Sequence, residues 1–280
     1  MAMHADQGQA EKGLAFRALH ERPQAFLIPN PWDAGTARLL TLLGFEALAT
    51  TSAGYALSSG RPDHAVARDE MLAHAAAIVS STSLPVSADL ENGYGDAPEA
   101  VAETVRLAAA AGLAGCSIED AAGERVYERE HAAERIRAAA EAARALPFAF
   151  TLTARAENYI TGRPDLADTI LRLQAYQEAG AAVLYAPGLT TREDIAAVVR
   201  SVDRPVNVLM GLHGVSLSLA ELSALGVRRV SVGSALARTA LGAFLRAARE
   251  LRDHGTFTFT EDAASLRDLN ALFAGGERPR

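Results

Sequence analysis

Short apolar runs alternate with longer amphipathic runs over almost the whole chain. The short runs are rich in β-branched residues and end in polar turns, which predicts strands. They cover residues 25–29, 46–52, 85–90, 114–119, 148–154, 181–186, 205–210 and 227–233. The longer runs between them repeat apolar residues at i, i+3 and i+4, which predicts helices. Eight β/α pairs are therefore expected, and the chain is predicted to be an α/β protein.

Eight β/α pairs in 280 residues suit a closed (β/α)8 TIM barrel. A doubly wound open sheet is the alternative. The barrel is favoured because polar residues gather at one end of nearly every predicted strand. Glycines that precede strands are expected to end helices in the left-handed conformation. These glycines are Gly44, Gly112, Gly180 and Gly226.

The chain shows no Pro/Gly/Ser-rich linker after position 20. We therefore expect a single barrel domain over residues 1–280, with a short N-terminal helix. The segment at about 256–280 is expected to be a helical extension, because it contains one amphipathic run followed by a polar tail.

Composition excludes several classes of protein. The formal charge of −7 argues against a nucleic-acid partner. The polar N-terminus and the lack of a long apolar run predict neither a signal peptide nor a membrane partner, and a cytoplasmic location follows. The only lysine is Lys12, so a Schiff-base mechanism, which needs a lysine inside a pocket, is excluded.

Side-chain alternation places polar groups on one face of three neighbouring predicted strands. Odd-numbered residues carry the polar side chains in residues 86–91, and the same parity holds in the next two strands. Since the active site of a barrel lies at the C-terminal ends of its strands, these groups are expected to meet at one rim. They are Asp89, Glu91, Glu119, Arg155 and Glu157. Cys116 falls on the opposite face and is expected to be structural.

Carboxylates that lie together repel one another unless a positive charge separates them. A divalent cation with oxygen ligands is one solution, and Mg²⁺, or Mn²⁺ in its place, suits such a rim. The alternative is a salt-bridge network in which Arg155 pairs with Glu119 and Glu157. Side-chain alternation alone does not decide between them.

Other polar residues also follow predicted strands. The segment 51–54 is a short polar turn whose backbone N–H groups could hold a carboxylate or a phosphate. His213 lies in a glycine-rich segment and is a candidate acid or base, although a solvated loop histidine is the commoner case. The remaining candidates at strand ends are Asn30, Trp32, Asp33 and Asn207.

Five motifs resemble the isocitrate lyase/phosphoenolpyruvate mutase superfamily in their order and spacing. They read PNPWDAGTARLL, TTSAGYALSSGRPD, VSADLENGYGD, GCSIED and TARAENY. The resemblance runs from about Ala25 to about Gly233. It implies an α/β barrel whose last helix is exchanged between subunits, a homodimer or homotetramer, bound Mg²⁺ and a small carboxylic acid as substrate.

The resemblance also implies metal ligands. Asp89 matches the direct ligand of the family, and it also lies against the substrate. Glu91 stands where the family usually has an aspartate, so its carboxylate reaches further by one methylene. Glu119 and Asp63 match carboxylates that hold metal-bound water.

The implied substrate contacts come from other strands. Thr51, Ser52 and Ala53 occupy the segment whose backbone grips the substrate carboxylate. Arg155 matches the arginine that stabilises the anionic intermediate, so Arg155 and Glu119 are the expected catalytic residues. Asn207 matches an asparagine that contacts the substrate.

The loop after Glu119 departs from the family pattern. Residues 120–129 contain no lysine, cysteine or histidine, whereas isocitrate and methylisocitrate lyases carry a Lys-x-Cys-Gly-His loop here. The Lys and Asn-Ser pattern of phosphoenolpyruvate mutase is absent as well, and Pro187 replaces a glutamate of many lyases. The general acid or base is therefore left open among Tyr127, Glu128 and His213.

The leading hypothesis is a Mg²⁺-dependent lyase that cleaves a C–C bond in, or decarboxylates, a small 2-oxo or 2-hydroxy di-acid through an enolate. One alternative is P–C bond chemistry of the phosphonopyruvate hydrolase or phosphoenolpyruvate mutase type. Another is a 2-oxo acid binding protein without turnover.

Overall fold

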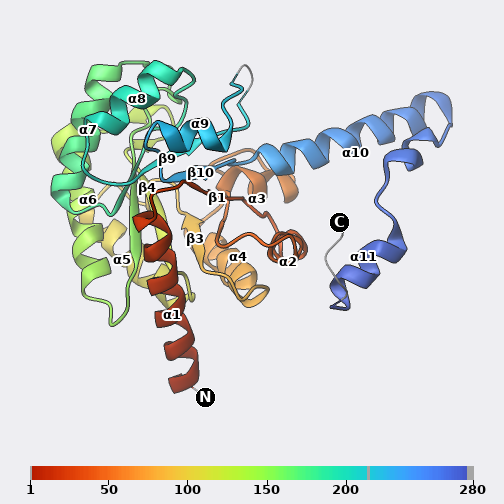
Figure 1. Cartoon of the computed structure of the whole chain (residues 1–280), viewed down its shortest axis with the longest axis horizontal. Helices are drawn as coiled ribbons and strands as arrows, with labels where there is room; N and C mark the ends of the chain where they lie inside the picture. Colours follow the sequence, from red (N-terminus) through yellow and green to blue (C-terminus); the bar gives the residue numbers. More distant parts are fainter. Residues whose placement is uncertain (1, 213–214, 276–280) are drawn as a thin grey trace.

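The computed structural model describes residues 2–212 and 215–275, and eight parallel strands in it form a nearly closed barrel surrounded by helices (Figure 1). Each strand overlaps a predicted one, so the (β/α)8 prediction is confirmed. The strands are β1 (Phe26–Ile28), β2 (Leu48–Ala49), β3 (Val86–Asp89), β4 (Gly115–Glu119), β7 (Thr151–Arg155), β8 (Val183–Tyr185), β9 (Val206–Leu209) and β10 (Arg229–Ser231).

Hydrogen bonds join the two ends of the sheet. The strands run in the order β1-β10-β9-β8-β7-β4-β3-β2, so β1 and β2 must meet to complete the ring. The Ala49 N–H donates to the Pro29 carbonyl at 3.1 Å. Asn30 donates to the Thr50 carbonyl at 3.0 Å and accepts from the N–H groups of Val232 and Gly233. One buried amide thus ties the ends of three strands together.

Helices fill every predicted interval between the strands. They are α2 (Ala34–Leu42), α4 (Arg68–Ser80), α5 (Pro98–Ala110), α6 (Arg129–Arg144), α7 (Leu166–Ala179), α8 (Arg192–Arg200), α9 (Leu219–Ala224) and α10 (Ala235–His254). The four glycines predicted to end helices all have positive φ, between 87° and 107°. Within the described residues, no helix is long and apolar enough to cross a membrane.

Two short elements escaped prediction. Helix α3 (Ser52–Ser58) begins at the segment interpreted as a polar turn, with Thr51 as its N-cap accepting from the Gly54 N–H at 3.1 Å. A hairpin of β5 (Ala121–Ala122) and β6 (Arg125–Val126) follows β4. Both are too short to show a hydrophobic period.

Helix α1 (Ala2–Glu21) covers the N-terminal end of the barrel (Figure 1). Phe16 is fully buried and packs in one cluster with Phe26, Ile28 and Ala114 at the start of the strands. The barrel is therefore closed at this end, which leaves the C-terminal ends of the strands as the open mouth.

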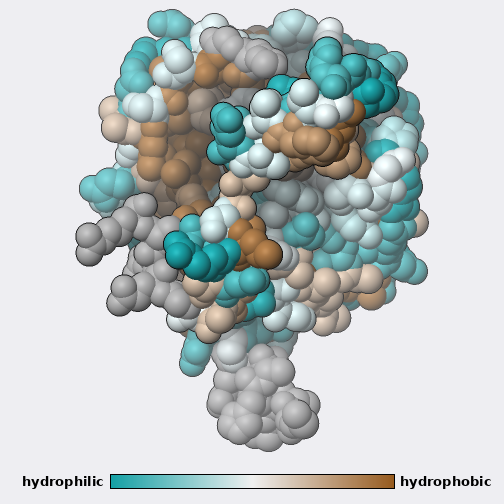
Figure 2. All heavy atoms as spheres, turned by 90° about the vertical axis from the view of Figure 1, so that its right-hand side faces the viewer, coloured by the Kyte–Doolittle hydropathy of each residue, from teal (hydrophilic) through white to brown (hydrophobic). Residues whose placement is uncertain are grey.

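The last long helix does not lie along the barrel. Helix α10 projects away from it, and the chain returns through η1 (Thr258–Asp262) and α11 (Leu266–Phe273) toward α2 (Figure 1). Phe244 and Phe257 on this arm are each 66% exposed. Figure 2, which faces this side, shows hydrophobic surface in patches around the arm. Such exposed apolar surface is typical of a protein interface.

A substitution at Gly115 tests the packing at the closed end of the barrel. A Cβ at this position would lie 2.4 Å from the Thr151 carbonyl oxygen and 3.1 Å from the Phe16 ring. Gly115→Ala should therefore destabilise the fold by about 1–3 kcal/mol, as overpacking does, and lower Tm by roughly 3–10 °C. Differential scanning calorimetry measures it.

Gly8→Ala is the matched control, because a Cβ at Gly8 in α1 would meet no atom within 4 Å. This variant should match or exceed the wild-type Tm, since alanine favours a helix more than glycine does. Equal Tm values for Gly115→Ala and the wild type would contradict the packing described for this end.

Candidate active site

A cavity of about 440 Å³ opens at the C-terminal ends of the strands. This volume suits a small molecule. Charged side chains line one side of the cavity, and neutral polar side chains with Arg229 line the other; Arg238 of α10 lines the cavity as well. The lining polar residues include Asp89, Glu119, Arg155, Glu157, Tyr185, Asn207, Arg229 and Ser231.

Arg155 lies at the centre of the charged side. Its Nη1 is 2.9 Å from Asp89 Oδ1 and 2.9 Å from Glu119 Oε1, and its Nε is 2.8 Å from Glu157 Oε1. The pairing of β4 with β7 explains this geometry, because Glu119 on β4 lies directly beside Arg155 on β7 in the strand register. The inward alignment predicted for these four residues is confirmed.

Burial and charge act together on these groups. Burial raises the pKa of Glu119 well above its usual value, and Arg155 counteracts only part of that effect. Burial also raises the pKa of Glu157. Burial alone lowers the pKa of Arg155, but Glu119, Glu157 and Asp89 together raise it well above its usual value. The guanidinium therefore stays positive within this group.

Asp89 is held in place from β2 and α3. Its Oδ2 accepts from the Ser52 hydroxyl at 2.8 Å and from the Ser52 N–H at 3.2 Å. Its own N–H donates to Thr50 Oγ1 at 3.0 Å. Thr51, Ser52 and Ala53, predicted to hold the substrate carboxylate, all line the cavity. The Ser52 N–H, however, is directed at Asp89.

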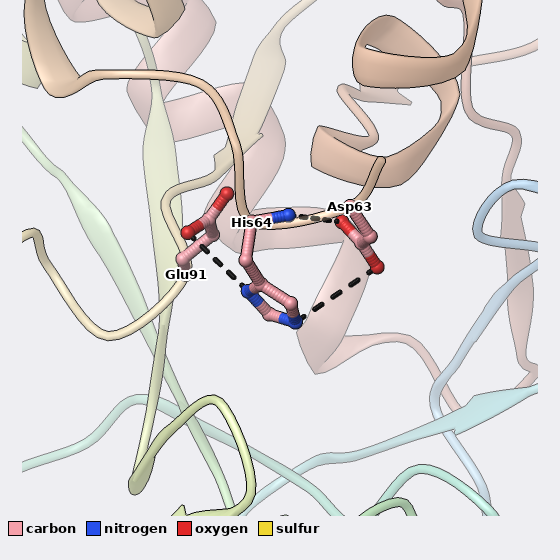
Figure 3. Close-up of side chains that lie close together, drawn as sticks. All are labelled: Asp63, His64 and Glu91. Carbon is pink, nitrogen blue, oxygen red and sulfur yellow. Dashed lines mark hydrogen bonds and ion pairs between the residues drawn. The ribbon is translucent and has the colours of Figure 1, made fainter. Parts of the chain in front are cut away.

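A second group of ionisable side chains lies beside the first. His64 stands between Asp63 and Glu91, with Nδ1 3.4 Å from Glu91 Oε2 and Nε2 3.9 Å from Asp63 Oδ2 (Figure 3). The Glu119 N–H donates to the Glu91 carbonyl at 2.8 Å, which links the two groups. The hydrogen bond to Glu91 is the main cause that raises the pKa of His64 to about 9.

Glu91 does not follow the alternation used to predict it. Strand β3 ends at Asp89, and Glu91 has a φ of +48°. This left-handed turn directs its side chain toward the loop that carries Asp63 and His64. His64 is not among the residues predicted for the site, because its only signal in the sequence is its position next to Asp63 in a loop.

The residues present fit a divalent cation. Carboxylates outnumber the positive groups in this part of the cavity. The positive groups are Arg155 and His64, and the carboxylates are Asp63, Asp89, Glu91, Glu119 and Glu157. Glu91 Oε1 is buried and has no hydrogen-bond partner, and an unsatisfied buried oxygen is costly unless something binds it. The oxygen-rich set matches Mg²⁺ or Mn²⁺ better than a softer metal. Asp63, Asp89, Glu91 and Glu119 stay the predicted ligands.

Asn207 lies on the other side of the cavity, in β9. Its Nδ2 donates to the Ser231 hydroxyl at 3.0 Å, and its Oδ1 accepts from Arg229 Nε at 2.9 Å. Asn207 is among the residues predicted for the site, whereas Ser231 and Arg229 are not. The alternation within residues 227–233 was the signal that could have found them.

Four further candidates, Tyr127, Glu128, Trp32 and Asp33, do not line the cavity. Tyr127 donates to Asp96 at 2.5 Å and accepts from Asn92, so it fixes a loop. Glu128 precedes α6 at its N-cap. His213 lies outside the described residues. Trp32 lies beside α2, for which Asp33 is the N-cap.

Two further expectations concern reactive side chains. Cys116 is fully buried in the main hydrophobic core, and burial raises its pKa to about 12, which agrees with a structural role. Lys12 donates to the Thr82 carbonyl from α1 and does not line the cavity. The exclusion of Schiff-base chemistry therefore agrees with the structure.

Comparisons with known proteins support the same class. The family described as phosphoenolpyruvate phosphomutase matches residues 16–252. The 2,3-dimethylmalate lyase of Eubacterium barkeri is 31% identical over 223 residues, which cover 75% of each chain. A crystal structure of a Burkholderia cenocepacia J2315 protein has a TM-score of 0.95 at 65% identity and covers 98% of this chain and 100% of that one.

A third comparison includes ligands. The complex of phosphonopyruvate hydrolase with oxalate and Mg²⁺ has a TM-score of 0.82 at 25% identity and covers 94% of this chain and 95% of that one. The chain belongs to the phosphoenolpyruvate phosphomutase family, within the isocitrate lyase/phosphoenolpyruvate mutase superfamily that the five motifs resemble. It is an enzyme of the lyase or mutase type.

Removing Asp89 tests the cation site. We expect Mg²⁺ to raise the Tm of the wild type, because a ligand that binds only the folded state stabilises it. Asp89→Ala should abolish this rise. Asp69→Ala is the matched control, because Asp69 is an exposed carboxylate on α4 whose one ion-pair partner among the described residues is Arg68. An undiminished response to Mg²⁺ in Asp89→Ala would rule this site out.

Proposed function

We propose that the protein is a Mg²⁺-dependent lyase that cleaves a C–C bond in, or decarboxylates, a small 2-oxo or 2-hydroxy di-acid through an enolate. The observation that carries this proposal is the position of Arg155, held among Asp89, Glu119 and Glu157 on the wall of the cavity. A fixed guanidinium there can stabilise an oxygen that becomes negative during the reaction.

Asp63, Asp89, Glu91 and Glu119 would hold the cation. When bound, Mg²⁺ would supply positive charge that stabilises negative charge on the substrate oxygens. The protein itself contributes by holding Asp89 and Arg155 in fixed positions. Ser52 and Thr50 fix Asp89, and Glu157 fixes the Nε edge of Arg155. Because these groups are held before the substrate arrives, little reorganisation is needed during the reaction.

The hairpin after β4 limits the choice of reaction. Of its residues, Ala121 and Gly123 line the cavity, and neither carries an acidic or basic side chain. Isocitrate-type cleavage with a cysteine base in this loop is therefore not proposed. One relative, 2,3-dimethylmalate lyase, is named for a substrate with a 2-hydroxy group and two carboxylates. The likeness to this relative supports the proposed cleavage of a di-acid.

P–C bond chemistry is the second candidate. Two findings favour it: the family is described as phosphoenolpyruvate phosphomutase, and the phosphonopyruvate hydrolase complex with oxalate and Mg²⁺ has the same fold. Phosphonopyruvate carries a 2-oxo acid at one end and a phosphonate at the other. The same charged wall suits the 2-oxo acid end of either substrate class.

A substrate panel separates the candidates. Oxaloacetate, 2-methylisocitrate, 2,3-dimethylmalate and phosphonopyruvate are each incubated with the enzyme and Mg²⁺, then with EDTA in place of Mg²⁺. We expect a carbon acid to release its 2-oxo acid product only with Mg²⁺. Phosphate release from phosphonopyruvate would favour the second candidate, and saturable binding without turnover of any acid would indicate a binding protein.

Arg155→Gln connects the activity to the cavity. With the best substrate of the panel, kcat should fall by about 10²-fold or more, as it does when one oxyanion-stabilising donor is removed. Arg106→Gln is the matched control, because Arg106 is exposed on α5 and pairs with Glu103. A kcat unchanged in Arg155→Gln would contradict the proposed role.

We further propose that the chain forms a homodimer or homotetramer through the arm built by α10. Phe244, Leu245 and Leu251 are exposed apolar residues on this helix, and the superfamily resemblance implies that the last helix is exchanged between subunits. A helix with one apolar face normally buries that face against a partner. A second copy of the chain would bury these residues.

The arm can be tested by size-exclusion chromatography with light scattering. The wild type should have the mass of two or four chains. Phe244→Asp should shift the mass to one chain, because an unpaired carboxylate at an apolar interface is costly. Leu14→Asp, an exposed leucine on α1, is the control and should not change the mass. A wild type of single-chain mass would overturn this interface.

A further inference from the structure

A second cavity, of about 520 Å³, lies at the opposite end of the barrel from the active site. We call it the basal cavity. It is bordered by α1, by the C-terminal end of α6 and by the starts of β7 and β8. Its volume is in the range of cavities that hold small molecules. None of the residues that line the active site lines the basal cavity, so the two are separate.

Arginines give the basal cavity a positive charge. Arg17 on α1, Arg144 on α6 and Arg204 before β9 all line it. Among the described residues that line it, the one carboxylate belongs to Glu21. His20 also lines it and is neutral, because burial lowers its pKa to about 3. The whole chain has a formal charge of −7, so this excess of positive charge is local.

Two of these arginines have no counter-ion among the described residues. Arg17 Nε lies 3.7 Å from Glu21 Oε1, an exposed pair along one helix face. Arg144 and Arg204 take part in no ion pair within the described part of the chain. The Arg144 guanidinium lies across Gly180, because its Nη1 would be 2.6 Å from a Cβ at that glycine. The missing side chain at Gly180 therefore leaves room for Arg144 to reach the basal cavity.

Apolar side chains form much of the remaining lining. Phe148 and Phe150 belong to the segment before β7, and Ala140 and Ala143 come from α6. Both phenylalanines are half-buried, so each leaves part of its surface accessible. A planar aromatic base packs favourably against such side chains. The basal cavity thus combines an apolar surface with guanidinium groups.

This combination favours one class of ligand. A guanidinium binds phosphate oxygens through paired hydrogen bonds. A single carboxylate has too few oxygens to pair with several arginines, whereas a di- or triphosphate has enough. Free pyrophosphate would leave the apolar surface uncovered, and a nucleoside would leave the guanidiniums unpaired. A nucleoside di- or triphosphate satisfies both parts of the cavity.

We propose that the basal cavity is a binding site for a nucleoside di- or triphosphate. Arg144 and Arg204, which lack counter-ions among the described residues, bind the phosphates. The base packs against Phe148 and Phe150. This inference does not rest on the proposed function, because no residue of the basal cavity belongs to the active site.

Calorimetric titration of the wild type with ADP tests the proposal. EDTA is present, so that no Mg²⁺–nucleotide complex can bind the carboxylates of the active site. We expect saturable binding of ADP, with a Kd roughly tenfold or more below the Kd values of pyrophosphate and of adenosine, because each of these lacks one half of the contacts. Added salt should weaken the binding of ADP, since salt screens the exposed arginines.

Two variants should weaken ADP binding without unfolding the barrel, because the substituted residues are exposed. The double variant Arg144→Gln/Arg204→Gln should raise the Kd for ADP roughly tenfold or more, since it removes two charged donors. Ala182→Glu should also raise it, because Ala182 lines the basal cavity and a carboxylate there repels phosphate. Arg137→Gln is the matched control, because Arg137 is exposed on the same helix as Arg144 and does not line the cavity.

The outcomes separate this inference from the lyase proposal. Absence of saturable ADP binding to the wild type would overturn the basal site, whatever the substrate panel shows. ADP binding that both variants leave unchanged would overturn it as well, because the nucleotide would then bind elsewhere. Equal Kd values for ADP and pyrophosphate would overturn the nucleoside assignment. ADP binding that both variants weaken, with Mg²⁺-dependent oxalate binding unchanged, would support the site even if no acid is turned over.

Discussion

The ion pairs of Arg155 organise the open end of this barrel. Three parallel strands end at one rim, and their inward side chains bring Asp89, Glu119 and Glu157 close together. Carboxylates this close repel one another and resist burial. The guanidinium in their midst relieves the repulsion, and the ladder between β4 and β7 fixes its position. Arg155 thus makes the rim compatible with a folded barrel.

The cavity has two chemically distinct sides because the barrel is closed. Neighbouring strands share a side, so β3 and β4 bring carboxylates together while β9 and β10 bring Asn207, Ser231 and Arg229 together.

The loop after β4 is fixed from beneath. Arg135 donates to the Glu119 carbonyl at 3.0 Å and lies over the Tyr127 ring, while Arg172 donates to the Tyr127 carbonyl at 2.8 Å. Asp120 is buried and pairs with Arg172. Tyr127 therefore has a positioning role at the base of the hairpin. Of the residues in this loop, Ala121 and Gly123 line the cavity.

The sequence by itself determined the eight strands, the helix-ending glycines, and the meeting of Asp89, Glu119 and Arg155 at one rim. These follow from local periodicity, which the backbone imposes wherever a strand or helix continues. Only the tertiary structure decided where Glu91 points, because its φ of +48° lies beyond the end of β3. It also decided that His64 approaches from a loop and that Arg229 orients Asn207. Such contacts join segments far apart in the chain, and no local pattern encodes them.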